Sequence, residues 1–497
     1  MRDSHELIDV SAQYPDGVAA LQRSGAHCRR IGNLRSCGVR SYDGLGASCG
    51  RRAFASIGVS VIDRTVPGGA LNILHVNTSD CVGGASRATY RLHTGLRRLG
   101  HDSFMYVAKR CSDDPNVISF RPPASLSGRA VRYLRRQWIA LGMKRYRMFR
   151  AAHLGAFSDD RVAYKGAVME QLPPSNVLNL HWISRFIDYE TFFAHVPQLP
   201  PIIWTLHDMS SFTGGCHYAH DCERYMNGCG ICPHLGSSDR NDLSHRIWHR
   251  KQRCLEKLGP GKLHLVVPSH WLAAKVANSA LLGRFPVTHI PNSVDIDIFS
   301  PRDCHLAREV LGIPQDGLVV LYIAQRLHNR HKGLAQLMQA LTGLCDLPNL
   351  FLVSVGYGEF PAVVDVPHLH LGYLDDERLL SLVYSAANLL AIPSSQDNLP
   401  NTVLESMACG VPVVGFETGG IPDMVRPGVT GLLVPVGDVI ALRDAIARLL
   451  KDSAGRAEME VNCRRVATEE YALEVQARRY VALYRCVLEV ADPDIRL

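Results

Sequence analysis

Short continuous apolar runs alternate with stretches of helical apolar spacing from about residue 71 onward. Continuous apolar runs of this length are typical of parallel strands that are buried on both faces. The helical stretches between them predict crossover helices, so the pattern favours two Rossmann-like halves and no solenoid repeat. The predicted strands include 71–77, 177–182, 201–208, 318–324 and 351–358, and the predicted helices include 85–99, 439–450 and 473–488. Residues 266–272 are predicted to hold the last strand of the first domain and the start of a helix.

Length and composition agree with this α/β prediction. The chain has 497 residues and 46% apolar content, which is enough for two or three domains. Residues 1–70 are rich in Arg, Gly and Ser and show no sustained period, which predicts a poorly ordered extension; a docking arm and an early start codon are the alternatives. Fifteen cysteines without an apolar leader indicate reduced thiols in an intracellular protein. No apolar run reaches the ~18 residues that cross a bilayer.

Two acidic residues, Asp397 and Glu405, bracket a short loop that runs into a predicted helix. A Gly-Val-Pro turn and a strand at 413–416 follow directly. The unpaired N–H groups at the start of a helix favour a phosphate. Carboxylates accept hydrogen bonds from sugar hydroxyls, so the pair of features indicates a nucleotide-sugar site.

These residues resemble the signature of retaining glycosyltransferases of the GT-B fold, family 4. The family pattern is Glu-x7-Glu, then Ala-Cys-Gly-x-Pro-Val-Val, a Gly-Gly pair and Thr-Gly-Leu-Leu-Val. Here the corresponding segments are 397–405, 408–414, 419–420 and 430–434, and the resemblance extends over roughly 71–485. The first acid is Asp397, one methylene shorter than the usual Glu, so either the sugar lies closer to the loop or this acid contributes less.

The resemblance implies a GT-B architecture, in which two Rossmann-like domains with parallel sheets face each other across a cleft. The implied ranges are an acceptor domain at 71–285 with a Cys-rich insertion at 213–235, a linker at 286–301, a nucleotide-sugar domain at 302–478, and a C-terminal helix and tail at 479–497 that cross back to the first domain.

The resemblance also implies the roles of individual residues. Glu405 would hold the donor ribose, Asp397 the sugar hydroxyls, and His207 would contact the transferred sugar. Lys and Arg side chains would stabilise the charge that the diphosphate gains as the glycosidic bond breaks, without a catalytic metal. Arg326 is displaced by one position from the usual spacing to Lys332, so Arg330 competes for its role. The predicted donor-binding residues are Gly83, Gly84, Arg326, Lys332, Gly356, Asn398, Leu399, Pro400, Asn401 and Thr402.

Histidines lie at the ends of two predicted strands, at His181 and His207. The carboxyl edge of an open parallel sheet is where ligands bind. A single histidine at such a position is more often a core residue, but two favour function. Asp208 is placed either to orient His207 or to face the acceptor.

Four cysteines are clustered within the Cys-rich insertion: Cys216, Cys222, Cys229 and Cys232. Four thiols with a Cys-x2-Cys pair have the ligand count of a structural zinc site, although the spacing is not that of a standard finger. Free thiols are the alternative. A catalytic thiol is not expected, because sugar transfer needs no such nucleophile.

A basic segment at 129–150 contains eight Lys and Arg residues and no acid, with aromatic and aliphatic residues at helical spacing. A helix of this kind can lie on an anionic membrane. A solvated basic face is the alternative, and nucleic acid is not expected because no nucleic-acid motif accompanies the charge. Membrane contact suits an acceptor carried on a polyprenyl lipid.

The resulting expectation is a cytoplasmic enzyme, peripheral on the inner face of the cell membrane. It would transfer a hexosyl-type sugar from a nucleotide donor to a glycan or polyprenyl-linked acceptor in polysaccharide biosynthesis, with no cofactor needed for catalysis. One alternative is a non-catalytic partner that binds a nucleotide sugar or glycan. The other is a different GT-B enzyme, such as an epimerase or phosphorylase, for which the necessary catalytic acids or pyridoxal-binding lysine are not found.

Overall fold

The computed structural model describes residues 69–150, 154–259, 261–360 and 366–491 of the 497-residue chain. The predicted N-terminal extension, 1–70, lies outside the described residues apart from 69 and 70. None of the described helices is long and apolar enough to cross a bilayer.

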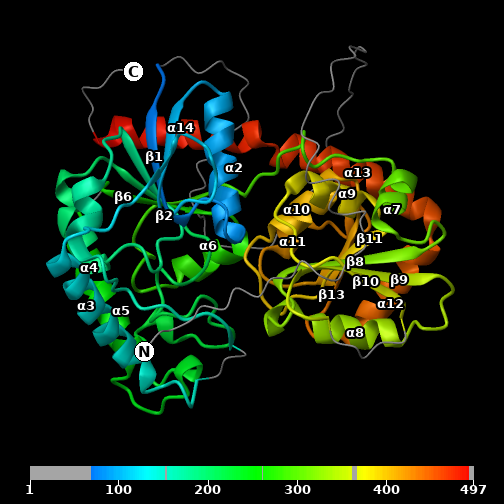
Figure 1. Cartoon of the computed structure of the whole chain (residues 1–497), viewed down its shortest axis with the longest axis horizontal. Coiled ribbons are helices and arrows are strands. Elements are labelled where there is room, and N and C mark those ends of the chain that lie inside the picture. Colours follow the sequence, from blue (N-terminus) through cyan, green and yellow to red (C-terminus); the bar gives the residue numbers. More distant parts are fainter. Residues whose placement is uncertain (1–68, 151–153, 260, 361–365, 492–497) are drawn as a thin grey trace, which may run out of the picture. The chain divides into compact units, whose positions relative to one another are not determined.

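The first domain contains a seven-stranded parallel sheet with the order β3-β2-β1-β4-β5-β6-β7 (Figure 1). Its two faces are buried against different layers, because alternate residues of each strand point to opposite sides. Leu74 and Leu178 belong to one apolar cluster, while Ile73 and Val177 belong to another that includes the C-terminal helix. The strands are β1 (Asn72–Ser79), β2 (Asp102–Lys109), β3 (Val117–Ser119), β4 (Val177–Leu180), β5 (Ile202–Thr205), β6 (Leu263–Val267) and β7 (Val287–His289).

The second domain contains a six-stranded parallel sheet with the order β10-β9-β8-β11-β12-β13. Its four inner strands are again buried on both faces, which is why they are near-continuous apolar runs in the sequence. The two sheets confirm the prediction of two Rossmann-like domains. The strands are β8 (Leu318–Arg326), β9 (Leu350–Tyr357), β10 (His368–His370), β11 (Leu389–Ile392), β12 (Val413–Phe416) and β13 (Gly431–Val434).

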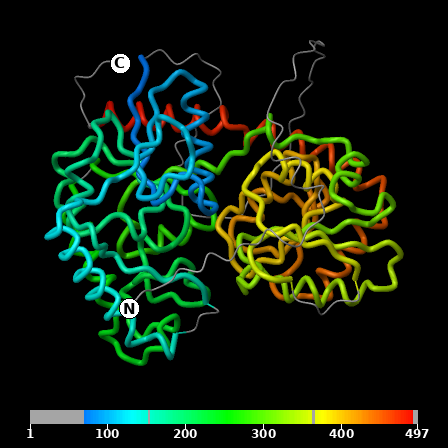
Figure 2. Tube along the Cα trace, in the orientation of Figure 1, coloured from blue at the N-terminus to red at the C-terminus, as the bar shows by residue number. Residues whose placement is uncertain are grey.

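Helices connect the strands of both sheets, as Figures 1 and 2 show. The α-helices are α2 (Gly84–Arg98), α3 (Leu126–Lys144), α4 (Tyr189–His195), α5 (Leu243–Leu255), α6 (His270–Ala277), α7 (Cys304–Leu311), α8 (Leu334–Thr342), α9 (Glu377–Ser385), α10 (Asn401–Ala408), α11 (Ile421–Met424), α12 (Val439–Lys451), α13 (Ser453–Tyr471) and α14 (Leu473–Ala491). Short 3-10 helices occupy η2 (Lys165–Gln171), η3 (Val196–Gln198), η4 (Arg224–Met226), η5 (Pro233–Leu235) and η6 (Arg330–Lys332).

Helix α14 returns to the first domain, as predicted. The Tyr484 hydroxyl accepts a hydrogen bond from Asn179 Nδ2 at 2.7 Å, and the hydroxyls of Tyr480 and Thr205 are 2.9 Å apart. The helix begins at Leu473, where the predicted helix 473–488 begins, because the extended backbone of Ala472 (ψ 154°) separates it from α13. Helix α13 still packs in the second domain, so the chain changes domain at Ala472.

Strand β7 lies inside the range predicted as linker, 286–301, so β6 is not the last strand of the first sheet. The strand has only three residues, and Val287 is its only strongly apolar side chain. Its backbone pairs with β6 from Leu265 to Val267, and this tertiary pairing leaves no periodic signal in the sequence.

Candidate functional site

The acidic loop connects β11 to α10 at the carboxyl edge of the second sheet. It carries Asp397, and Glu405 lies in α10 itself, so the predicted loop, helix and following strand are all present. The Gly419–Gly420 pair packs directly against this loop: a Cβ at Gly419 would lie 1.6 Å from the Asp397 carbonyl oxygen. Gly419 also has φ +58°, which glycine adopts at little cost. The glycine pair therefore permits the close approach that positions Asp397.

Glu405 is 2% exposed and its carboxylate is bound on both oxygens. Arg91 Nη2 from α2 donates to Oε1 at 2.7 Å, and the Tyr384 hydroxyl donates to Oε2 at 2.9 Å. The same Arg91 nitrogen lies 2.6 Å from Glu377. Burial acts to lower the pKa of Arg91, but the two carboxylates outweigh this effect and raise it. Sequence reasoning placed Glu405 in the site but missed Arg91 and Tyr384, which no local motif connects to it.

Asp397 forms an ion pair with Lys332, whose Nζ lies 2.5 Å from Oδ2. Lys332 ends η6, directly after β8, and Gly333 lets this turn approach β11: a Cβ there would lie 1.8 Å from the Pro393 carbonyl oxygen. Arg326 and Arg330, the two predicted diphosphate-binding arginines, are exposed nearby in the same β8–η6 segment. Of these three cationic side chains, Lys332 contacts the acidic loop, through its ion pair with Asp397.

Two residues of the predicted donor-binding loop contact the first domain through their side-chain amides, while the prediction for this loop concerned its backbone N–H groups. Asn398 Nδ2 donates to the His207 carbonyl oxygen at 2.9 Å, and Asn398 Oδ1 accepts from Ser269 Oγ at 2.6 Å. Asn401 Nδ2 donates to the Gly84 carbonyl oxygen at 2.9 Å. The loop therefore meets the segments that follow β1 and β5 at the carboxyl edge of the first sheet.

The remaining predicted donor residues are placed by backbone packing. Gly83 has φ +90° and precedes α2, where a Cβ would face the Gln325 side chain at 3.7 Å. Gly356 lies in β9, where a Cβ would be 2.0 Å from the Ala324 carbonyl oxygen, so this glycine is required for the contact between β8 and β9. Leu399 is buried, and Pro400 and Thr402 flank the first residue of α10.

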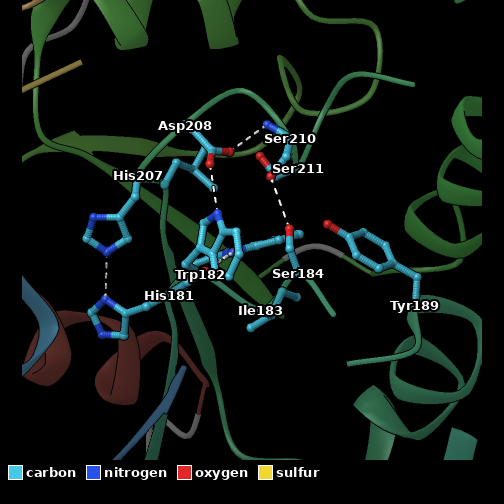
Figure 3. Close-up of a pocket in the computed structure, with 11 residues that line it drawn as sticks. His181, Trp182, Ile183, Ser184, Tyr189, His207, Asp208, Ser210 and Ser211 are labelled. Atoms are coloured by element: carbon cyan, nitrogen blue, oxygen red, sulfur yellow. Dashed lines mark hydrogen bonds between the residues drawn. The ribbon is translucent and has the colours of Figure 1, made fainter. Parts of the chain in front are cut away.

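Three histidine rings form a chain from the interior of the first sheet to its carboxyl edge. His75 Nδ1 lies 2.9 Å from His181 Nε2, and His181 Nδ1 lies 3.1 Å from His207 Nε2 (Figure 3). Burial lowers the pKa of His207 to about 4, although the charge of Asp208 acts to raise it. His207 is therefore neutral near pH 7 and exchanges hydrogen bonds rather than presenting a cation.

Asp208 lies beside His207 and is held by several donors (Figure 3). Trp182 Nε1 donates to its Oδ2 at 2.8 Å, and His217 Nδ1 lies 2.6 Å from the same oxygen. Burial acts to raise the pKa of Asp208, but His217 and Ser210 lower it overall to about 2. The carboxylate is ionised and oriented toward His217, so it does not hydrogen-bond the His207 ring as predicted.

The Cys-rich insertion reaches the acidic loop. The backbone N–H of His220 donates to Gln396 Oε1 at 3.1 Å. Burial raises the pKa of Tyr218, and the charges of Asp397 and Asp208 and a hydrogen bond to Asp397 raise it further. Tyr218 is therefore a contact of Asp397 that sequence reasoning did not identify, because no local pattern connects the two residues.

The four cysteines of the insertion are free thiols that line one common cavity. No three of their sulfurs meet at metal-ligand distance: among the described residues, the groups of potential ligand atoms that lie within 4.8 Å of one another are Asp80–Cys81–Cys111 and His270–His289–Asp423. A structural zinc ion at these cysteines stays a prediction.

Helix α3 contains residues 129–144 of the predicted basic segment, 129–150, and none of the residues of this helix is buried. Arg135 attaches it to the domain through an ion pair with Asp188 at 2.8 Å. Leu134 and Trp138 are 66% and 57% exposed, and Val131 and Leu141 continue this apolar stripe at helical spacing.

Comparison with known proteins identifies the second domain. Residues 317–452 match the family described as glycosyl transferases group 1. N-acetyl-alpha-D-glucosaminyl L-malate synthase of Bacillus anthracis is 27% identical over 40% of this chain and 53% of its own length. D-inositol 3-phosphate glycosyltransferase of Mycobacterium leprae is 34% identical over 33% of this chain and 40% of its own. These alignments thus span about half of the relatives or less. WcaC of Escherichia coli K12, which its name assigns to colanic acid biosynthesis, is 24% identical over 72% of this chain and 85% of its own length.

Solved structures show the same fold over most of the chain. Sucrose-phosphate synthase of Thermosynechococcus elongatus has a TM-score of 0.57 and 20% identity, and covers 84% of this chain and 99% of its own. HepE of Anabaena, solved with UDP, has a TM-score of 0.56 and 17% identity, and covers 84% of this chain and 100% of its own. The matched residues carry the second sheet and the acidic loop, so the second domain is similar to the glycosyl transferases group 1 family over residues 317–452, and the chain has the two-domain GT-B fold.

Proposed function

We propose that this protein transfers a sugar from a nucleoside-diphosphate donor to a glycan or lipid-linked acceptor, with retention at the anomeric carbon, in polysaccharide biosynthesis. The observation that carries the proposal is the Lys332–Asp397 pair at the carboxyl edge of the second sheet, beside the N-terminus of α10. A helix N-terminus and a lysine suit a diphosphate, and a carboxylate suits sugar hydroxyls. The relatives named as glycosyltransferases and the UDP-glucose complex of HepE support this assignment.

In the proposed reaction the donor diphosphate replaces Asp397 as the partner of Lys332. Arg326 and Arg330 are exposed on the same segment and add positive charge near the leaving group. Preorganised cations stabilise a leaving diphosphate most where water is excluded. Asp397, released from Lys332, then accepts hydrogen bonds from the sugar.

Glu405 holds the donor ribose in this proposal. Its carboxylate is bound by Arg91 and Tyr384, so the ribose hydroxyls must take the place of one of these donors. Arg91 belongs to α2 of the first domain, whereas Tyr384 and Glu405 both belong to the second. We therefore propose that Arg91 is the donor that the ribose displaces. Neutral His207 contributes a hydrogen bond to the transferred sugar from the opposite domain.

The acceptor-side partner in this proposal is an anionic membrane, contacted through α3. The helix presents the stripe Val131, Leu134, Trp138 and Leu141 to solvent and has no acidic residue, so apolar insertion and attraction to lipid headgroups act together. This would place the protein on the cytoplasmic face of the membrane. We expect the full chain to co-sediment with vesicles of phosphatidylglycerol, and Leu134→Ser with Trp138→Ser to abolish this binding. Two results would contradict the proposed membrane contact of α3. One is that the double variant co-sediments with phosphatidylglycerol vesicles as well as wild type does, and the other is that wild type co-sediments equally well with neutral phosphatidylcholine vesicles.

The test of the proposed function is the melting temperature in a panel of nucleotide sugars, followed by product analysis with the bound donor. A ligand at about 100 times its dissociation constant stabilises the folded state by roughly 2.7 kcal/mol. We expect one donor to raise the melting temperature, and both Lys332→Ala and Asp397→Asn to reduce the shift. Glu469→Gln, on the exposed face of α13, is the matched control.

A non-catalytic binding partner is the second candidate. The observation that favours it is the shortened acid, Asp397, whose charge is neutralised by Lys332. Donor binding without any transfer or donor hydrolysis, in the presence of vesicles and candidate acceptors, would establish this alternative.

A further inference from the structure

Three potential metal ligands converge where the first domain meets α11 of the second. His289 is the last residue of β7, His270 is the first residue of α6, and Asp423 lies in α11. One ligand atom from each of the three side chains lies within 4.8 Å of the others. Strand β6 pairs with β7 in parallel, with Val267 opposite His289, so the segment leading into α6 and the end of β7 share the carboxyl edge of the sheet.

The two imidazole rings are close together, with centroids 4.1 Å apart. The Asp423 carboxylate is held beside them because its Oδ2 accepts the backbone N–H of His270 at 2.7 Å, and the same oxygen lies 3.3 Å from His270 Nδ1. The carboxylate is therefore oriented by the backbone, independently of the charge of either histidine.

The orientation of His289 is also determined by a hydrogen bond outside the cluster. Its Nε2 lies 3.2 Å from the Pro268 carbonyl oxygen. A carbonyl oxygen only accepts, so Nε2 carries the proton and Nδ1 is left with a lone pair. Metal-binding histidines commonly donate their other ring nitrogen to a backbone carbonyl in this way.

We propose that His270, His289 and Asp423 bind one divalent transition-metal ion of the Zn²⁺ type, with water completing the coordination. Two imidazoles and one carboxylate form a ligand set that such ions prefer over Mg²⁺ or Ca²⁺, which take mainly oxygen ligands. The site has no part in the proposed sugar transfer, so it stands or fails separately from it.

The position of the site gives the ion a structural role. Ser269, next to His270, contacts both Asn398 of the acidic loop and Gly420, where a Cβ would lie 2.5 Å from that of Ser269. A bound ion would join α6 and β7 to α11 directly beside these contacts. It would therefore stabilise the meeting of the two domains next to the acidic loop.

The test is titration of the full-length, metal-stripped protein with Co²⁺, followed by absorbance. Co²⁺ bound to nitrogen and oxygen gives visible d–d bands, while binding to any of the cysteines adds thiolate charge-transfer absorption in the near ultraviolet. We expect one Co²⁺ to bind through nitrogen and oxygen ligands and to be displaced by Zn²⁺, with this binding weakened roughly tenfold or more in His289→Ala and in Asp423→Asn. A second ion at the four cysteines would add thiolate bands that these two variants leave unchanged. His305→Ala, which removes an exposed histidine of α7, should bind as wild type.

Asp423→Asn retains an oxygen that can accept the His270 N–H, so this variant is expected to fold, and circular dichroism would check it. Overturning outcomes are an absence of Co²⁺ binding, binding that His289→Ala and Asp423→Asn leave unchanged in folded protein, and binding that shows thiolate bands only. Donor-induced melting shifts, measured with and without Zn²⁺, report separately on the sugar-transfer site.

Discussion

Arg91 Nη2 lies 2.7 Å from Glu405 Oε1, although the two residues are 314 positions apart in the chain. The pair is buried and joins α2 of the first domain to α10 of the second, with Glu377 as a further partner of the arginine. Glu405, which is predicted to bind the donor, is thus also part of a buried network of ion pairs. A substitution in this network is therefore expected to affect both the stability of the fold and donor binding.

Replacement of Arg91 by Ala should lower the free energy of unfolding by about 3–5 kcal/mol, because it leaves the Glu405 carboxylate buried without its cation. Urea denaturation measures this loss. Arg91→Lys should recover part of it, since the charge is retained. The control is Arg465→Ala, which breaks an exposed ion pair with Glu469 and should cost no more than about 1 kcal/mol. Similar losses in the two Ala variants would contradict the importance of the buried pair.

Lys332→Ala should reduce the rate of sugar transfer by about 10²–10³-fold, the usual effect of removing one group that stabilises developing charge. The measurement is donor turnover at saturating acceptor. Asp397→Asn should also reduce transfer while it preserves the fold, because the amide is nearly isosteric with the carboxylate. Lys451→Ala, on the exposed end of α12, is the control. Wild-type turnover in Lys332→Ala would exclude this lysine from the donor site.

The buried histidines predict that stability falls in mild acid. The pKa of His207 is about 4 in the folded protein, against 6.5 as its ordinary value, so the unfolded state binds more protons between these pH values. The neutral His207 ring contributes about 3 kcal/mol to the free energy of unfolding above pH 6.5, and this contribution is lost as the pH falls toward 4. Denaturation midpoints at several pH values measure it.

His207→Asn should flatten this pH dependence, whatever its effect on stability at neutral pH. His195→Ala replaces an exposed histidine and should leave the slope unchanged. An unaltered slope in His207→Asn would show that this ring titrates at its ordinary pKa.

Gly419→Ala should abolish the donor-dependent melting shift, because its Cβ would lie 1.6 Å from the Asp397 carbonyl oxygen and must displace the acidic loop. Gly437→Ala is a matched control, since Gly437 also has a positive φ, of +81°, but a Cβ added there would have no atom within 4 Å. Both variants incur backbone strain, and only the first should disturb the site. A full donor shift in Gly419→Ala would show that the loop tolerates displacement.

Much of the fold and part of the site could be predicted from local sequence. The strands β8, β9, β11 and β12 are near-continuous apolar runs, and a run buried on both faces can be recognised without knowledge of its neighbouring strands. Asp397, Glu405 and Lys332 could be identified because each lies within a few positions of a strand or helix end whose pattern is clear. Local sequence also predicted a basic helix at 129–150 with apolar residues at helical spacing that could face a membrane, and α3 leaves its apolar stripe exposed.

The sequence by itself therefore determined the α/β class, the two parallel sheets and the loop that carries the acids, because each depends on the spacing of nearby residues. Tertiary structure alone decided the partners: Arg91 and Tyr384 for Glu405, Tyr218 for Asp397, and Asp423 for the two histidines at the end of β7 and the start of α6. These contacts join segments that no periodicity connects. Only the packing of two sheets and their crossover helices brings such residues together.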